Sequence, residues 1–141
     1  KMKIAVIDAQ GAGLGQAVIK KLRKEIGENI HIISLGTNKY ATSNMVKVGA
    51  NKGFTGEVQI CSFLQNNDID FIIGPIGIIS SGGIQGEITP RISQTIFQMD
   101  CIKYIIPLNL HGLYIPGTRN LEIKEIIEEI VLDIKARVND L

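Results

Sequence analysis

Residues 3–15, KIAVIDAQGAGLG, decide the fold of this chain. The stretch opens with an uninterrupted apolar run that ends at Asp8, a pattern typical of a buried parallel strand. Three glycines, Gly11, Gly13 and Gly15, follow directly, and an amphipathic helix begins among them. This order of strand, glycine-rich turn and helix is typical of phosphate-binding sites. In such sites the backbone N–H groups near the helix N-terminus face the phosphate. The stretch therefore predicts a Rossmann-like unit and a phosphate-bearing ligand.

Strand-like and helix-like segments alternate along the rest of the chain. Apolar runs bounded by glycine, proline or asparagine predict strands at residues 3–8, 30–35, 70–74 and 102–107, with a short strand near 113–115. Apolar side chains at helical spacing predict helices at residues 13–26, 40–48, 56–65, 90–98 and from 121 onward. Such alternation implies right-handed crossovers. We therefore expect an α/β fold: a single doubly wound Rossmann-like domain over residues 1–141, with a mainly parallel sheet and helices on both faces.

Turn and capping residues set the limits of several of these segments. Gly27 is expected to end the first helix, and Thr89 with Pro90 has the residue types of an N-cap and a first helical position. Residues 49–57 are rich in glycine and are expected to form a shaped loop. Residues 58–63 also alternate in polarity, so a strand stays open there as an alternative to the helix.

The composition narrows the class of protein. A chain of 141 residues fits one domain, and its formal charge of +1 gives no electrostatic reason to expect nucleic acid or an anionic membrane as partner. Aromatic residues make up 5% and tryptophan is absent, so few rings are present for bases to stack on. No apolar run reaches the length of a membrane span, and a secretory signal peptide is not expected. Cys61 and Cys101 are expected to be buried free thiols of a cytoplasmic protein, with a disulfide between them as the alternative.

The candidate ligand-binding residues follow the expected strands. Parallel sheets bind ligands beyond the carboxyl ends of their strands, here Asp8, Gly36, Gly74 and Pro107. Because these ends lie at one edge of the sheet, the polar and glycine-rich loops after them are expected to meet there. The candidates from three of these loops are Asp8, Gln10, Gly11, Gly13, Leu14, Gly15, Gly36, Thr37, Asn38, Gly74, Pro75 and Gly77.

The glycine loop departs from known phosphate-binding patterns. Its spacing is G-x-G-x-G, whereas the Rossmann fingerprint G-x-G-x-x-G would need a glycine at Gln16. In another register the loop resembles the T-G-x-x-x-G-x-G loop of short-chain dehydrogenases, with Asp8 in place of threonine and Ala9 in place of the first glycine. Asp8 either adds negative charge beside the anion site or turns back to cap the amides of the loop. The other interpretation of the glycines is a tight turn without a ligand.

A second determinant of dinucleotide binding is missing. An acid about 20 residues after the glycine loop usually holds the adenine ribose. This chain has Gly36, Thr37, Asn38 and Lys39 at that place. Lys39 suits a 2′-phosphate and so favours NADP over NAD. The ligand is left open between a nucleotide, a dinucleotide such as NAD or NADP, and another phosphorylated small molecule.

Catalytic motifs are scarce. The chain has no Tyr-x-x-x-Lys, no G-x-x-x-x-G-K-[ST], no G-x-S-x-G and no H-E-x-x-H, and its two histidines lie far apart, so no metal is expected. The candidates for acid–base chemistry are Asp8, Glu57 and Glu87, with His111 as a proton shuttle. For Glu57 and Glu87 the alternative is a structural role in the first turn of a helix, where the helix dipole stabilises a carboxylate. Whether the protein is an enzyme is therefore left open.

Two further features allow either a structural or a binding role. Lys47 and Lys52 flank residues 49–57 and either hold an anionic ligand or stay solvated. The last helix carries one apolar stripe, made of Ile123, Ile126, Ile127, Ile130, Val131, Ile134 and Val138. The stripe is expected to pack on the sheet, with a helix-mediated homodimer as the alternative.

Several short sequence segments together resemble a family of small bacterial proteins of the Firmicutes type that is known only as a domain of unknown function. These segments lie in at least five loops and are residues 3–8, 10–15, 35–38 with 41–42, 49–51, 55–57, 74–77, 86–90 and 107–109. The resemblance covers nearly the whole chain. It implies a Rossmann-like fold and a cytoplasmic bacterial protein, and it implies no established activity. Ala9 and Ala12 replace glycines expected from the family pattern, which suggests a tighter loop here.

Three functions follow from the residues. The first is a nucleotide-binding or dinucleotide-binding protein whose ligand lies across the carboxyl edge of the sheet. The second is a non-catalytic sensor or protein-interaction module that uses the glycine loop only as a turn. The third is an enzyme that acts on a phosphorylated small metabolite without a nucleotide cofactor.

Overall fold

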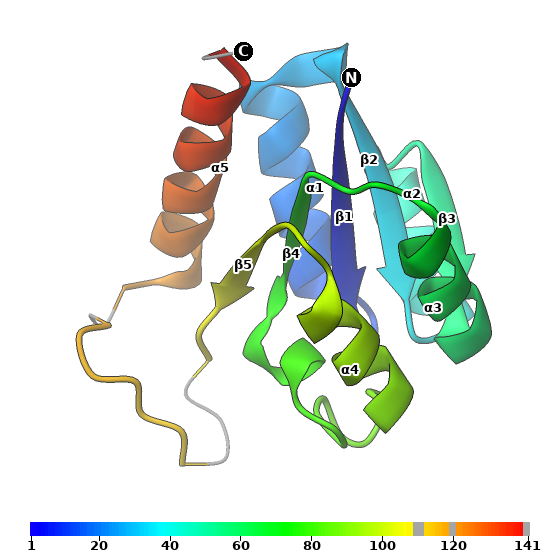
Figure 1. Ribbon diagram of the computed structural model, residues 1–141. Helices are drawn as coiled ribbons and strands as arrows, with labels where there is room; N and C mark the ends of the chain where they lie inside the picture. Colours follow the sequence, from blue (N-terminus) through cyan, green and yellow to red (C-terminus); the bar gives the residue numbers. More distant parts are fainter. Residues whose placement is uncertain (109–111, 119–120, 140–141) are drawn as a thin grey trace.

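The computed structural model, which describes residues 1–108, 112–118 and 121–139, is built on one five-stranded parallel sheet in the order β3-β2-β1-β4-β5 (Figure 1). The strands are β1 (Met2–Asp8), β2 (Ile30–Gly36), β3 (Lys52–Thr55), β4 (Phe71–Pro75) and β5 (Ile102–Ile106). The helices are α1 (Gly13–Glu25), α2 (Lys39–Lys47), α3 (Gly56–Asn66), α4 (Pro90–Gln98) and α5 (Ile123–Asn139), with short 3₁₀ turns η1 (Gly27–Asn29) and η2 (Ile76–Ile79). The α/β class and the Rossmann-like arrangement are thus confirmed.

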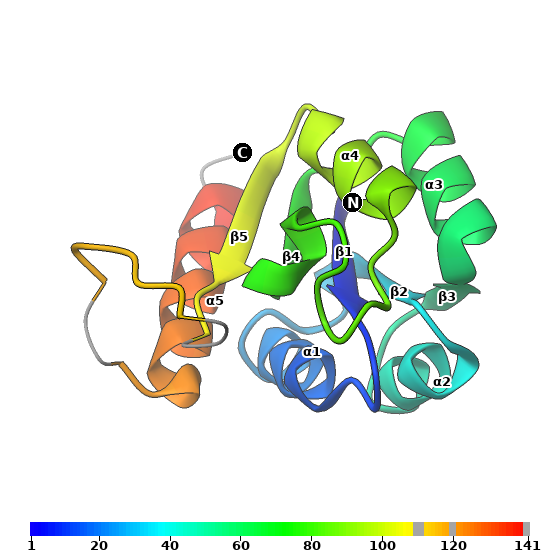
Figure 2. The same cartoon turned by 90° about the horizontal axis from the view of Figure 1, so that it is seen from below.

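The helices form two layers, one on each face of the sheet (Figure 2). One hydrophobic core holds side chains of α1, α2 and α5, among them Leu22, Met45 and Ile130, against β1 and β4. The other core packs α3 and α4 against the opposite face and includes Ile60 and Ile96. Because apolar side chains are buried on both faces, the strands are nearly continuous apolar runs, as expected for a parallel sheet.

The strand order reverses between β1 and β4. After β2 and β3 have been added on one side of β1, the chain returns to place β4 and β5 on the other side. In open α/β sheets ligands bind at this switch point, beyond the carboxyl ends of the strands. The loops after β1, β2 and β4 meet there, at the edge that we call the rim.

Two predictions of secondary structure were wrong. Residues 52–55, expected in a loop, form the edge strand β3, which pairs with residues 33–36 of β2. This strand is short and largely exposed, so it lacks the apolar pattern on which strands are recognised. Residues 113–115, expected to form a strand, have no regular structure, because β propensity stabilises a strand only where a partner supplies a ladder. For residues 58–63 the helix, not the strand, is correct.

The helix termini follow their sequence signals. The hydroxyl of Thr89 accepts a hydrogen bond from the N–H of Ile92 at 3.2 Å, as an N-cap does, and Pro90 is the first residue of α4. Gly27 follows α1 with a φ of 89°. The stripe of α5 packs on the sheet and on α1, with Ile127 and Ile134 buried, which confirms the packing interpretation. No helix in the described part of the chain is long and apolar enough to cross a membrane.

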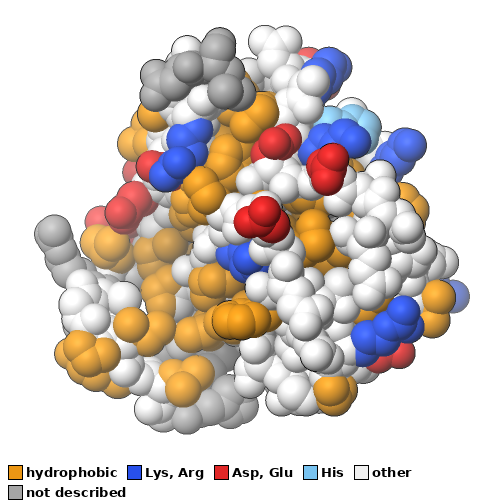
Figure 3. All heavy atoms as spheres, in the orientation of Figure 1, with side chains coloured by type: hydrophobic (Ala, Val, Ile, Leu, Met, Phe, Trp, Pro, Cys, Tyr) orange, Lys and Arg blue, Asp and Glu red, His pale blue; other side chains and the backbone are white. Residues whose placement is uncertain are grey.

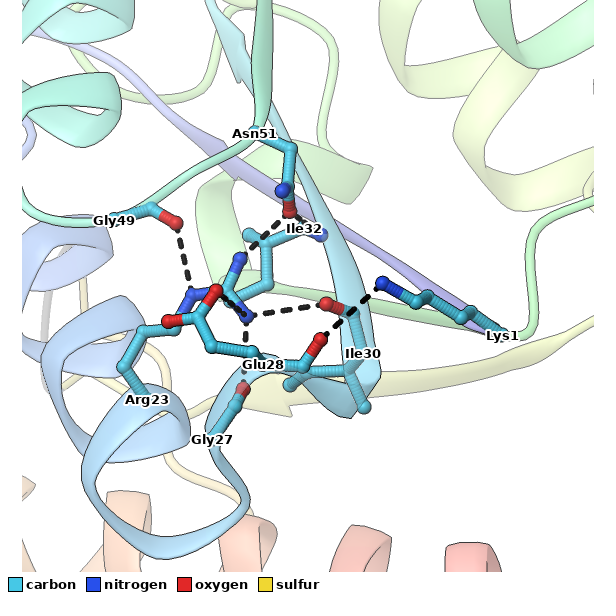
Figure 4. Close-up of polar contacts among 8 residues, drawn as sticks. All are labelled: Lys1, Arg23, Gly27, Glu28, Ile30, Ile32, Gly49 and Asn51. Carbon is cyan, nitrogen blue, oxygen red and sulfur yellow. Dashed lines mark hydrogen bonds and ion pairs between the residues drawn. The ribbon is translucent and has the colours of Figure 1, made fainter.

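Arg23 joins several segments at the amino end of the sheet, opposite the rim (Figure 4). Its Nε donates to the carbonyl of Gly49 at 2.9 Å, and its Nη1 donates to the carbonyls of Gly27 at 2.8 Å and Ile30 at 3.1 Å. Its Nη2 reaches the side-chain oxygen of Asn51 at 2.6 Å. One guanidinium therefore ties α1 to the turn before β2 and to the segment before β3.

Candidate functional site

The loop after β1 does not use its glycines to make the turn. The left-handed residues are Gln10, with a φ of 51°, and Ala12, with a φ of 56°, whereas Gly11 and Gly13 have ordinary backbone conformations. A Cβ added at either glycine would meet no protein atom within 4 Å. Both glycines are exposed. Neither the backbone nor the packing of this chain therefore requires glycine at positions 11 and 13.

The other glycines among the candidates are required by packing. A Cβ on Gly15 would lie 2.6 Å from Sδ of Met45, and one on Gly36 would lie 2.5 Å from the backbone nitrogen of Thr42. A Cβ on Gly74 would lie 2.8 Å from the carbonyl oxygen of Ile7. A Cβ on Gly77 would lie 2.7 Å from a side-chain carbon of Ile84. These glycines allow elements to approach closely, and their presence is explained without a ligand.

Asp8 turns toward the amides of the loop. Its carboxylate is buried and accepts hydrogen bonds from the N–H groups of Ala9 and Gly15, each at 2.8 Å. Burial raises the pKa of Asp8 above its ordinary value, although the two hydrogen bonds act in the opposite direction. Of the two orientations that the sequence left open, the structure has the one in which Asp8 caps the loop.

Side chains from two helices hold the loop in place. The carbonyl of Gly11 accepts hydrogen bonds from Gln16 in α1 and Asn44 in α2, each at 3.0 Å. The side chain of Asn38 donates to the carbonyl of Gln10 at 3.0 Å. These contacts fix the carbonyls on one side of the loop, so the orientation of its N–H groups is set before any ligand arrives.

Three N–H groups of the loop are left for a ligand. Those of Gly11, Gly13 and Leu14 make no hydrogen bond with the described residues, and the N-cap residue Ala12 has no side chain that caps α1. Gly13 and Leu14 are the first two residues of α1, where the helix dipole adds positive potential. The arrangement suits an anion, and the exposed space over Gly11 and Gly13 leaves room for one.

Glu87 reaches this loop from the opposite side of the switch point. Its Oε1 accepts hydrogen bonds from the hydroxyl of Thr37 at 2.6 Å and the side-chain amide of Asn38 at 2.9 Å. The N–H of Gln10 lies 3.2 Å from both carboxylate oxygens. Burial would raise the pKa of Glu87, but these donors outweigh it and hold the pKa below its ordinary value. The sequence did not reveal this contact, because the partners lie 49 to 77 residues away along the chain.

The remaining candidates are spread unevenly over the molecule. Glu57 lies in the first turn of α3, where the helix-dipole interpretation placed it. Glu87 precedes α4 and lies in no helix, so the helix-dipole interpretation was wrong for Glu87. Lys47 and Lys52 lie at the last turn of α2 and the start of β3, away from the rim, so their role in holding a ligand there is excluded. His111 lies outside the described residues. The described part of the chain has no cluster of His, Cys, Asp and Glu suited to a metal.

A separate groove lies between β5 and α5, on the flank of the sheet farthest from β3. Its volume is about 1060 Å³, and Ile105, Ile126 and Leu132 are among its lining residues. Figure 3 shows hydrophobic side chains gathered over this flank. The hydroxyl of Tyr104, which also lines the groove, donates to Asp133, and burial together with this contact raises the pKa of Tyr104 to about 12.

Comparison with known proteins agrees with the fold. No curated protein matches the chain. A solved structure with a similar fold is the dodecameric FMN-dependent UbiX-like decarboxylase from Escherichia coli O157:H7, with a TM-score of 0.55 and 13% sequence identity. The similarity covers 98% of this chain and 95% of the other, and at that identity it shows the fold alone. The family model described as Domain of unknown function (DUF3842) matches residues 3–139, and the chain therefore belongs to this family.

Proposed function

We propose that the protein binds a phosphorylated small ligand, with a phosphate on the N–H groups of Gly11, Gly13 and Leu14. The observation that carries this proposal is the pair of glycines at positions 11 and 13. Neither has a left-handed φ, and neither would bring a Cβ against the protein. A ligand that lies close to the backbone gives both positions a reason to lack a side chain.

FMN is the first ligand to test among the phosphorylated candidates. The structural neighbour is described as FMN-dependent, and it aligns with nearly the whole chain. NAD and NADP stay on the list of candidates, since Lys39 follows β2 and suits a 2′-phosphate. Glu57 at the start of α3 and Glu87 at the rim are the carboxylates available for acid–base chemistry.

The test is a comparison of ligands with and without phosphate. We expect FMN, and not riboflavin, to raise the melting temperature in a thermal-shift assay, because only FMN offers an anion to the loop. At 100 times its Kd a ligand adds about 2.7 kcal/mol of stability, which corresponds to several degrees for a domain of this size. NAD, NADP, AMP and inorganic phosphate form the rest of the series. If none of these anions stabilises the protein, the glycine loop is only a turn and the interaction module replaces this proposal.

We further propose that copies of the chain associate through the flank of β5 and α5. β5 is an edge strand, and Leu132 of α5, which lines the groove on this flank, exposes 63% of its surface. Exposed apolar surface beside an open sheet edge is typical of an interface. The structural neighbour is described as dodecameric, which also supports self-association.

The oligomeric state is measured by light scattering after size-exclusion chromatography. We expect the wild-type chain to elute as an oligomer and Leu132→Glu to elute as a smaller species, because the new charge lies in the apolar interface. The matched control is Phe97→Glu, which places the same charge at a residue of α4 that is 72% exposed, and which should leave the oligomer intact. A wild-type monomer, or equal effects of the two variants, would refute this flank as the interface.

A further inference from the structure

The contacts of Glu87 define a second anion-binding position at the rim, which we call the acid seat. It consists of the N–H of Gln10, the hydroxyl of Thr37 and the side-chain amide of Asn38, all within 3.2 Å of the Glu87 carboxylate. These donors come from the loops after two neighbouring strands, β1 and β2. Three donors that converge on one carboxylate form a site that suits carboxylate or phosphate oxygens in general.

The acid seat adjoins the position proposed for the ligand phosphate. Gln10 supplies one donor to the seat, and the next N–H along the chain, that of Gly11, has no partner among the described residues. A ligand anion on the loop would therefore lie next to the negative charge of Glu87. Because like charges at such short range repel each other, binding an anionic ligand here is unfavourable while the Glu87 carboxylate stays in place.

The segment that carries Glu87 is strained. Ile84 and Gln85 have φ values of 52° and 53° without being glycine, and for a β-branched residue such as Ile84 this conformation is an outlier. The segment is also folded tightly, since a Cβ on Gly83 would lie 2.0 Å from the carbonyl oxygen of Gly77. Strained conformations persist where surrounding contacts hold them, and they gather at positions that move in function. The hydrogen bonds of Glu87 are contacts of this kind.

We propose that the acid seat receives an anionic group of the ligand, and that Glu87 is an internal occupant which the ligand displaces. This inference rests on the proposed function, which it deepens: the ligand carries two neighbouring anionic groups, such as the diphosphate of NAD or NADP, whereas the single phosphate of FMN would fill only one of the two positions. One group lies on the N–H groups of Gly11, Gly13 and Leu14, and the other replaces the Glu87 carboxylate at Gln10, Thr37 and Asn38. Residues 80–88 then leave the rim when the ligand binds.

The test compares the affinity of inorganic pyrophosphate and of inorganic phosphate for the wild-type protein and for Glu87→Gln by titration calorimetry. Loss of the competing charge is expected to tighten pyrophosphate binding at least tenfold and phosphate binding less. The matched control is Glu28→Gln, which makes the same change of charge at a side chain that is 87% exposed and lies before β2, at the end of the sheet opposite the rim, and which should alter the affinity less than twofold. Glu87→Ala removes the whole side chain from the acid seat and serves as the second variant, which should also bind pyrophosphate more tightly than the wild-type protein.

Hydrogen exchange of the wild-type protein supplies an independent measurement. The N–H groups of Gly82, Gly83 and Ile88 are bonded within the segment. Pyrophosphate is expected to speed their exchange, because the strained conformation of the segment loses the hydrogen bonds of Glu87 that hold it. If pyrophosphate binds the wild-type protein but Glu87→Gln binds it no more tightly, Glu87 does not compete with the ligand and displacement is refuted, while the proposed function stands. If neither anion binds any variant, both proposals fail.

Discussion

We expect Gly13→Asp to weaken the binding of FMN, or of whichever phosphorylated ligand stabilises the wild-type protein, by at least a hundredfold. The new carboxylate would project into the open space over the loop, because a Cβ at position 13 meets no protein atom within 4 Å. There it competes with the ligand phosphate for the N–H groups of the loop and repels it. The fold should persist, since a carboxylate in the first turn of α1 is favourable against the helix dipole. Titration calorimetry measures the affinity, and circular dichroism measures the fold.

Two controls distinguish a specific effect of Gly13→Asp at the phosphate position from the general effects of an added side chain and a changed net charge. Gly13→Ala keeps the N–H and adds one methyl group, so it should leave the fold intact and reduce affinity only as far as the methyl group crowds the ligand. Lys20→Gln changes the net charge by the same amount as Gly13→Asp at an exposed position of α1 and should leave affinity nearly unchanged. Retention of wild-type affinity by a folded Gly13→Asp protein would refute the phosphate position.

The fold was predictable because its signals are local. The apolar runs of β1, β2, β4 and β5 mark strands buried on both faces, and Thr89, Pro90 and Gly27 mark helix termini by their own backbone preferences. β3 was missed because its pairing with β2, and not its own composition, makes it a strand. The stripe of α5 predicted a buried face and left open whether a sheet or a second chain covers it. Tertiary structure was needed to decide.

The candidate site was predictable only in part, for a different reason. The sequence placed the glycine loop at the end of a strand, but it did not show which glycines serve packing and which face open space. Gly15 and Gly36 are required by Met45 and Thr42, which belong to α2, whereas Gly11 and Gly13 are not required by any protein atom nearby. Glu87 contacts Thr37 and Asn38 in the loop after β2, although it lies 50 and 49 residues further along the chain. Contacts over such sequence separations leave no local pattern.

We expect Arg23→Met to lower the free energy of unfolding by about 3 kcal/mol, a large share of the roughly 5–15 kcal/mol typical of a folded domain. Methionine keeps the aliphatic part of the side chain and removes the donors that now serve the carbonyls of Gly27, Ile30 and Gly49 and the side chain of Asn51. Hydrogen bonds from a charged donor contribute about 1.5–3 kcal/mol each, and they do not add fully, because water replaces some of them. Urea unfolding followed by circular dichroism gives the difference.

The geometry of the guanidinium, more than its charge, should account for this loss. The ion pair with Glu28 spans 3.9 Å and the Glu28 side chain is 87% exposed, so it contributes little. Arg23→Lys keeps the charge, but one ammonium cannot replace donors that point in three directions, so it should recover only a minor part of the stability. Arg91→Met, at an exposed position of α4, is the matched control and should change stability by less than about 0.5 kcal/mol. If Arg23→Lys were as stable as the wild-type protein, the positive charge, and not the several N–H donors of the guanidinium, would hold α1 to the segments before β2 and β3.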